Sequence, residues 1–273
     1  MSATSAAHTT ASRAANSKWL ERLARAGFIG YGIVHLLFAW LALQIAFGNA
    51  SQEGDQTGAM RTLAQQPLGK VLLVLIAIGL AAMAIWQALE AAVGNTVYSG
   101  GRRTLERLSS VGRTIVYGYL AWTAVKVVRD AASSSADQQQ QKTQDLMSST
   151  GGRWLVGVAG LVIIGFGIGF VIYGIKKVFL KYLLTWRMSP RTRRLAERLG
   201  MAGYVAKGVA FGIAGILFTA AAVEYDPDKA RGLDGALRTL RDQSYGPVLL
   251  VLVALGIAAF GFYCFLQSKY RKV

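Results

Sequence analysis

Long apolar runs, separated by shorter polar segments, are the main pattern along this chain. Six such runs occupy residues 28–47, 71–93, 115–128, 154–175, 204–223 and 248–266. Apolar stretches of about 18 residues or more are long enough to cross a bilayer as helices. The third run is shorter and holds Lys126 near its end, but its neighbours support it. The pattern predicts an all-α polytopic membrane protein with six transmembrane helices.

The chain also repeats itself. The segment GAMRTLAQQPLG at 58–69 returns as GALRTLRDQSYG at 235–246, and each precedes a closely similar apolar run. A second element, Glu-Arg-Leu with a Gly four residues after the Leu, occurs three times. Its defining residues are Glu21 and Arg22, Glu106 and Arg107, and Glu197 and Arg198. Repetition on this scale indicates tandem structural units.

We therefore divide the chain into a tail at 1–19 and three two-span units at 20–98, 105–181 and 196–270. The tail is small and polar, and we expect it to be disordered and cytoplasmic. Because each unit has an even number of spans, all three share one orientation and could surround a pseudo-threefold axis. The first span of the middle unit can be aligned in two registers that differ by three residues.

These units resemble a known family. The opening (Ala/Leu)-Glu-Arg-Leu-x-x-x-Gly, followed by a Gly-rich first span such as GYVAKGVAFGIAG at 203–215, is similar to the bacterial membrane proteins of domain-of-unknown-function family 1206. The resemblance covers nearly the whole chain from about residue 20. It implies three copies of a two-helix unit, and it implies no activity and no catalytic residues.

The distribution of charge supports a membrane location. The chain is 53% hydrophobic and 16% charged, with a formal net charge of +16. Most Lys and Arg lie before the first span, in the second and fourth connections and at the C-terminus, whereas most acidic residues lie in the other connections. An excess of Lys and Arg marks the cytoplasmic side, so both termini are expected there, in the cytoplasmic membrane.

A basic cytoplasmic face suits anionic lipid headgroups, and no nucleic-acid partner is needed to explain the charge. Arg191, Arg193 and Arg194, in the connection before the fifth span, are the candidate lipid contacts.

Short helices are expected on both sides of the bilayer. In the outer connection of the first unit, Ala59, Met60 and Leu63 share one helical face, which predicts an interfacial helix stopped by Pro67. The homologous segment of the third unit has the same spacing. On the inner side, each Glu of the Glu-Arg-Leu elements could pair with an Arg of a neighbouring unit and join the units in a ring.

Few polar groups fall within the spans. His35 lies about 12 Å into its helix, and one alignment places it opposite Tyr117 and Phe211. We favour a hydrogen-bonded packing histidine over a proton relay or ligand site. Gln87 and Glu90 lie near the inner end of the second span, where a carboxylate can reach the interface or an arginine.

Other features of the spans have structural explanations. Lys207, near the inner end of the fifth span, is expected to extend towards the interface. The four-residue spacing of Gly165 and Gly169, and of Gly208 and Gly212, predicts close packing of helices within the chain.

No catalytic constellation can be assembled from one cysteine, Cys264, and two histidines, His8 and His35. We expect the protein to have no enzymatic activity and to bind no metal and no cofactor. The leading hypothesis is a non-enzymatic role in binding lipid or envelope proteins, which leaves a membrane-protein partner or a homo-oligomer open. The alternative is a small-solute or ion permease with a path between the three units.

Overall fold

The computed structural model describes residues 18–92, 100–130, 132, 134–149 and 151–272. This part of the chain is helical, apart from turns and one isolated bridge between Leu183 and Arg271. The expected tail at 1–19 lies almost wholly outside the described residues. The long helices are α2 (Lys18–Ala46), α4 (Gly69–Ala92), α5 (Gly100–Val128), α7 (Gly152–Ile175), α8 (Pro190–Glu224) and α10 (Gly246–Tyr270).

Five of these helices, α2, α4, α7, α8 and α10, are long and apolar enough to cross a membrane. The remaining long helix, α5, contains the expected third span at 115–128. It has 29 residues, but its first half is polar, with Arg103, Arg107 and Arg113. The six expected spans therefore correspond to six long helices, of which α5 meets the requirement for length and not the one for composition.

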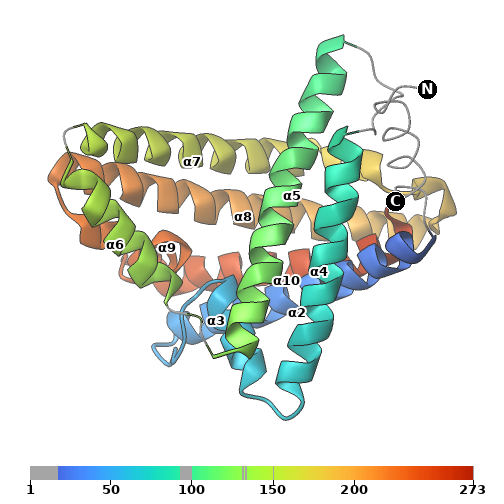
Figure 1. Cartoon of the computed structure of the whole chain (residues 1–273), viewed down its shortest axis with the longest axis horizontal. Helices are drawn as coiled ribbons and strands as arrows, with labels where there is room; N and C mark the ends of the chain where they lie inside the picture. The colour runs from blue at the N-terminus through green and yellow to red at the C-terminus, as the bar shows by residue number, and fades with distance from the viewer. Residues whose placement is uncertain (1–17, 93–99, 131, 133, 150, 273) are drawn as a thin grey trace, which may run out of the picture.

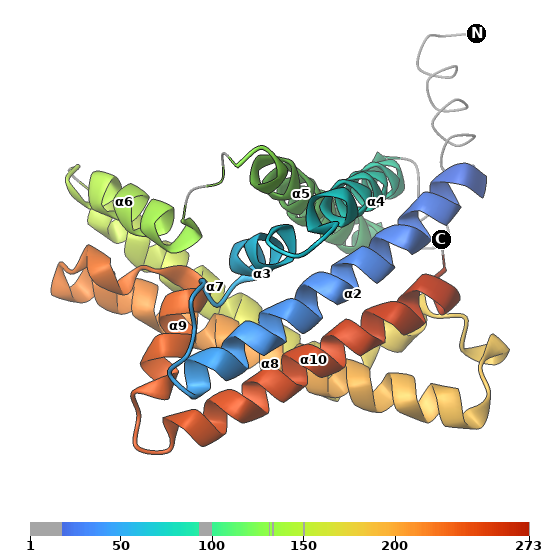
Figure 2. The same ribbon diagram turned by 90° about the horizontal axis from the view of Figure 1, so that it is seen from below.

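The helices pack in pairs that cross the repeat boundaries. The three pairs in most extensive contact are α7 with α8, α10 with α2, and α4 with α5. Each pair joins the second helix of one repeat to the first helix of the next, and the pair of α10 with α2 returns from the last repeat to the first. Figure 2 shows α2 and α10 side by side along their length. The pairing is cyclic, as a pseudo-threefold arrangement requires.

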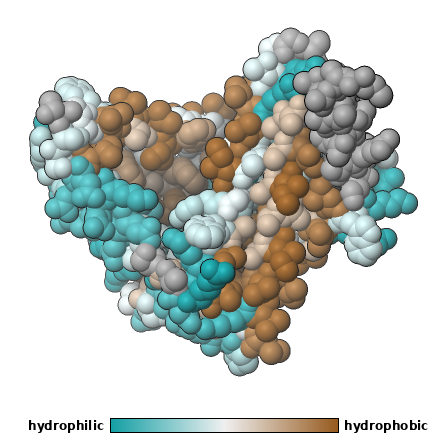
Figure 3. Space-filling view, viewed as in Figure 1, coloured by the Kyte–Doolittle hydropathy of each residue, from teal (hydrophilic) through white to brown (hydrophobic). Residues whose placement is uncertain are grey.

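Within a repeat, packing is uneven. The helices α2 and α4 pack against each other, as do α8 and α10, whereas the described residues of α5 and α7 make no extended contact. These two helices diverge in Figure 1, and Figure 3 shows an apolar hollow between them. Their exposed apolar side chains include Leu108, Ile115, Tyr119 and Trp122 on α5 and Leu155, Leu161, Phe166 and Ile172 on α7.

Glycine contacts explain the tightest helix pair. A Cβ on Gly208 would lie 2.9 Å from the backbone nitrogen of Val171, and one on Gly167 would lie 2.7 Å from the nitrogen of Gly212. The predicted close approach is therefore present, but its partner on α7 is Gly167. Gly165 and Gly169 face open space, because they lie on the opposite side of α7 from Gly167. A Cβ on Gly212 would also meet nothing within 4 Å, so of the predicted pair on α8 only Gly208 needs to lack a side chain.

Short helices form the connections on one side of the bundle. These are α3 (Gln56–Ala64), α6 (Ser135–Met147) and α9 (Gly232–Arg241). The predicted face of α3, Ala59, Met60 and Leu63, is buried, and the helix ends before Pro67. That face packs onto the protein, mainly against α2 and α5, so α3 covers the bundle instead of placing its apolar side in the bilayer.

The three connections bind one another through polar contacts. The Ser135 hydroxyl donates to Thr57 Oγ1 at 2.6 Å, and the Gly54 amide donates to Asp234 Oδ1 at 2.8 Å. Asp55 caps the start of α3 by accepting from the Gly58 amide at 2.8 Å. Residues from all three repeats thus meet here, in what we call the connector node: Glu53, Gly54, Asp55, Thr57, Ser135 and Asp234.

The other side of the bundle, which we call the terminal end, carries the start of α2 and the end of α10. Two 3₁₀ turns, Val178–Tyr182 and Thr185–Arg187, connect α7 to α8. The Leu184 amide donates to the Tyr270 carbonyl at 2.7 Å, and the Lys272 amide donates to that of Tyr182 at 2.9 Å. The C-terminal residues are therefore tied to this connection.

Candidate functional site

A cluster of aromatic and basic side chains lies where α2, α5, α7, α8 and α10 approach one another. We call it the central cluster, and it consists of Tyr31, His35, Tyr117, Phe170, Lys207 and Phe260. The rings of Tyr31 and Tyr117 meet edge to face with centroids 5.5 Å apart, and those of Tyr31 and Phe260 at 6.0 Å. All three repeats contribute to the cluster.

His35 is completely buried in this cluster. Its Nδ1 lies 2.9 Å from the carbonyl oxygen of Tyr31, one turn earlier on α2. Because a carbonyl only accepts, Nδ1 carries the proton and Nε2 keeps its lone pair in the neutral ring. Among the described residues, Nε2 has no hydrogen-bond partner. The expected hydrogen bond is present, and the other ring nitrogen is buried without a protein partner.

Lys207 turns towards the bundle interior, and the expected extension to the interface is wrong. Its Nζ lies 4.0 Å from the Phe260 ring centroid and 3.4 Å from the Tyr31 hydroxyl. The faces of aromatic rings attract a cation, which explains why the ammonium prefers this position to an extended one. The rings of Tyr31 and Phe170 are also near it, at 5.7 and 5.8 Å.

A second polar layer lies between the central cluster and the terminal end. Arg113 Nε donates to Gln87 Oε1 at 2.9 Å. The guanidinium groups of Arg113 and Arg271 lie 5.4 and 4.8 Å from the Tyr182 ring centroid. Glu90 interacts electrostatically with both arginines. The predicted Gln87–Glu90 pair thus meets arginines, as one of the two expectations for Glu90 required.

The ring of Glu-Arg pairs between units is not formed. Glu21 binds Arg25 of its own helix at 2.9 Å, and Glu106 binds Lys181 at 2.5 Å and accepts from the Tyr182 hydroxyl at 2.7 Å. Glu197 binds Arg193 and, across a repeat boundary, Lys177 at 2.9 Å.

The arginines of the three elements have other contacts. Arg22 stacks on Trp19, with its guanidinium carbon 5.4 Å from the ring centroid, and Arg107 donates to the Ala92 carbonyl at 2.7 Å. Arg198 is exposed. Successive residues on a helix point in different directions, so the Glu and Arg of one element bind separate partners, some on their own helix and some on adjacent segments.

A basic pocket of about 240 Å³ opens at the terminal end, between the end of α7 and the start of α8. Its lining residues are Lys177, Arg194, Glu197, Arg198 and Met201. Of the three arginines proposed as lipid contacts, Arg194 lines this pocket. Arg193 binds Glu197 at 3.2 Å beside it, and Arg191 is exposed nearby.

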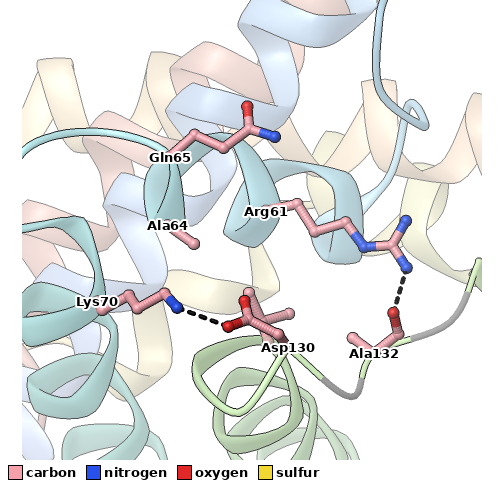
Figure 4. A pocket seen from close by; sticks show the side chains of 7 residues that line it. Arg61, Ala64, Gln65, Lys70, Asp130 and Ala132 are labelled. Atoms are coloured by element: carbon pink, nitrogen blue, oxygen red, sulfur yellow. Dashed lines mark hydrogen bonds and ion pairs between the residues drawn. The ribbon is translucent and has the colours of Figure 1, made fainter.

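A second pocket, of about 290 Å³, lies on the connector side between α3 and the adjoining ends of α4 and α5 (Figure 4). Arg61 donates to the Ala132 carbonyl at 2.7 Å, and Lys70 binds Asp130 at 2.7 Å. Both cations of the first repeat therefore bind residues of the second repeat, and these structural contacts explain the pocket.

The part of the chain that the structure describes contains no group of three His, Cys, Asp or Glu residues arranged to hold a metal. The only sulfur nucleophile, Cys264, is completely buried next to the central cluster.

The architecture defines a helical membrane protein built from three tandem two-helix repeats. The chain belongs to the family described as Domain of Unknown Function (DUF1206), whose model matches residues 26–94, 108–177 and 202–271. It is similar to the "Uncharacterized protein YxxB" of Bacillus subtilis (strain 168), with 31% identity over 256 residues, which cover 93% of this chain and 92% of that protein. No solved structure matches.

The matched ranges place residues of the central cluster and of the second polar layer at equivalent positions of the repeats. Counting from the starts at 26, 108 and 202 places His35 level with Tyr117 and Phe211, and Tyr31 level with Arg113 and Lys207. Each repeat therefore places a polar or aromatic side chain at the same two levels of its first helix. This equivalence could have indicated from the sequence that Arg113 and Lys207 lie inside the bundle. No sequence feature indicated the same for Arg271.

Proposed function

We propose that this protein is a non-enzymatic lipid-binding protein of the cytoplasmic membrane that holds an anionic phospholipid headgroup in the basic pocket of the terminal end. The observation that carries the proposal is the position of Lys177, Arg194 and Arg198 around one opening. Glu197 is engaged by Lys177 and Arg193. Arg194 and Arg198 have no ion-pair partner among the described residues. Their planar guanidinium donors are therefore available to bind a phosphate group.

The surroundings of the pocket suit the rest of a phospholipid. Met201, which lines the pocket, is 37% exposed, and Ile172 and Ile175 on the last turn of α7 are 47% and 59% exposed. A headgroup in the pocket would place its acyl chains along this apolar surface. Burial of each additional methylene contributes about 0.8 kcal/mol, so the apolar contact adds affinity to the electrostatic one.

The proposal includes an orientation. An excess of Lys and Arg favours the cytoplasmic side, where anionic lipids create a negative surface potential. The terminal end, with both termini and the basic pocket, would face the cytoplasm, and the connector node would face outwards.

Native mass spectrometry of the protein released from nanodiscs tests this function. In equal mixtures of phosphatidylglycerol and phosphatidylcholine, the wild type should retain phosphatidylglycerol, and the Arg194→Gln/Arg198→Gln variant should lose roughly tenfold or more of that preference. The matched control is Arg187→Gln/Arg191→Gln, which removes two exposed charges outside the pocket. Equal losses in both variants would mean that net charge, and no particular pocket, attracts the lipid.

The central cluster favours a second candidate function, a small-solute or ion permease. All three repeats contribute to it, and it holds polar atoms inside the bundle. Light-scattering measurements on proteoliposomes shocked with potassium chloride, potassium acetate or glycerol test this candidate. Flux that is lost in His35→Ala supports a permease, and flux equal to that of empty liposomes argues against one.

A further inference from the structure

Lys207 is a cation without a counter-charge. It makes no ion pair with any described residue, and its Nζ lies near the Tyr31 hydroxyl and the rings of Tyr31, Phe170 and Phe260. A charge in a medium of low polarity is costly unless it is paired. Ring faces supply only part of the compensation. The missing component is a negative charge.

A second polar atom of the same cluster is suited to an anion. The Tyr31 hydroxyl accepts a hydrogen bond from Lys207 Nζ at 3.4 Å, so its own proton is available to a ligand. The rings of Tyr31 and Phe260 pack against the ring of His35, with centroids at 4.3 and 4.8 Å. The ammonium and the hydroxyl therefore lie together among aromatic rings.

The aromatic geometry also has a defined polarity. Tyr31 meets Tyr117 and Phe260 edge to face, with interplanar angles of 87° and 86°. Ring faces carry partial negative charge and ring edges partial positive charge. Lys207 Nζ lies over the face of Phe260, 4.0 Å from the ring centroid. No carboxylate of the described residues contacts Lys207 to compete for it.

We propose that Tyr31 and Lys207 form a binding site for one small monovalent anion, such as chloride, formate or acetate. The Lys207 ammonium provides the opposite charge, and the Tyr31 hydroxyl donates a hydrogen bond. The site is distinct from the basic pocket of the terminal end, and it does not depend on lipid binding.

The test uses the full chain in nanodiscs of phosphatidylcholine alone, so that no anionic lipid competes. Thermal unfolding is followed by tryptophan fluorescence while sodium chloride, formate or acetate replaces sodium gluconate at constant ionic strength. A ligand that binds only the folded state raises the melting temperature in a saturable way, by roughly 5 °C at a hundredfold excess over its Kd. The comparison of chloride with the two carboxylates identifies which kind of anion the site prefers.

Three variants test whether the rise in melting temperature comes from the proposed site. Lys207→Met should abolish the saturable rise, and Tyr31→Phe should weaken the apparent affinity several-fold while preserving the ring. Lys126→Met is the matched control, because Lys126 lies over Trp122 on α5, outside the cluster. An unchanged rise in Lys207→Met, or a wild type that responds to these anions no more than to gluconate, would overturn the proposal. If Lys207→Met does not fold, the Tyr31→Phe titration decides the question.

Discussion

Gly79 of α4 lies directly against Gly27 of α2, so that a Cβ on Gly79 would come within 2.7 Å of the Gly27 Cα. The two backbones touch where a larger residue would have to push them apart. Gly27 is the glycine that follows the first Glu-Arg-Leu element, and Gly79 lies in the run after the first connector helix. The repeat motif thus marks a point of helix contact.

We expect Gly79→Ala to destabilise the protein by about 1–3 kcal/mol, because the added methyl overpacks this crossing. The control is Gly118→Ala on α5, where a Cβ would meet nothing within 4 Å. Thermal unfolding in nanodiscs compares the two. A Gly79 variant as stable as the Gly118 variant would show that the helices can separate at no cost.

The connector node should respond to pH through Asp55. Burial, opposed by the hydrogen bond from Gly58 and reinforced by Glu53, raises the pKa of this carboxyl from 3.8 to about 6. The folded state therefore holds the proton more tightly than the unfolded state. Its contribution to stability is complete below about pH 3.8 and is lost as the pH rises through about 6, an effect on the order of 3 kcal/mol.

The measurement is the unfolding temperature across pH 4 to 8 for the wild type and for Asp55→Asn. Asparagine also caps helices well, so this variant keeps the start of α3 and removes the titration. Asp130→Asn serves as the control, since Asp130 is exposed and binds Lys70. A pH profile that is the same in Asp55→Asn and the wild type would assign the dependence to other groups.

Gln87 and Arg113 should be energetically coupled. Gln87 is buried and accepts the Arg113 Nε–H, so Gln87→Leu leaves that donor without its partner and should cost about 1–3 kcal/mol. Replacing both residues, as Gln87→Leu/Arg113→Met, should restore part of the loss. A double-mutant cycle measures the coupling, and strictly additive effects would contradict it.

Arg271 should matter more than its place near the end of the chain suggests. It is buried, its guanidinium lies over Tyr182, and its carbonyl accepts from Arg25. Arg271→Ala should therefore loosen the connection at 178–187 and raise its rate of cleavage by trypsin severalfold. Lys269→Ala is the comparison, because the Lys269 side chain is exposed and lies over Tyr270, outside this connection. Equal cleavage rates in the two variants would show that Arg271 does not hold this connection in place.

The helices were predictable because apolar runs and repeated glycines report directly on local structure. Residues 154–175 and 248–266 fall within α7 and α10 almost end to end. By contrast, α6 was not expected, because its sequence SADQQQQKTQDLM has no apolar stripe. Its position depends on contacts with other repeats, such as that of Gln140 with Asp228.

The candidate site was only partly predictable for the same reason. Periodicity identifies His35 as an intramembrane polar residue, but it does not show which helix supplies the next side chain. Lys207 joins His35 because α10 brings Phe260 between α2 and α8, and this arrangement depends on packing across repeat boundaries. The direction of a lysine side chain is a property of its neighbours, and sequence spacing alone does not contain it.

The cyclic pairing of helices has a consequence for biogenesis. Among the described helices, α2 is synthesised before all the others, yet its most extensive partner, α10, is synthesised after them. Until then, one flank of α2 has only lipid to contact. In a chain truncated before Gly246, the surface of α2 that normally contacts α10 would remain exposed to lipid. Membrane quality control could recognise an incomplete product by that exposed surface.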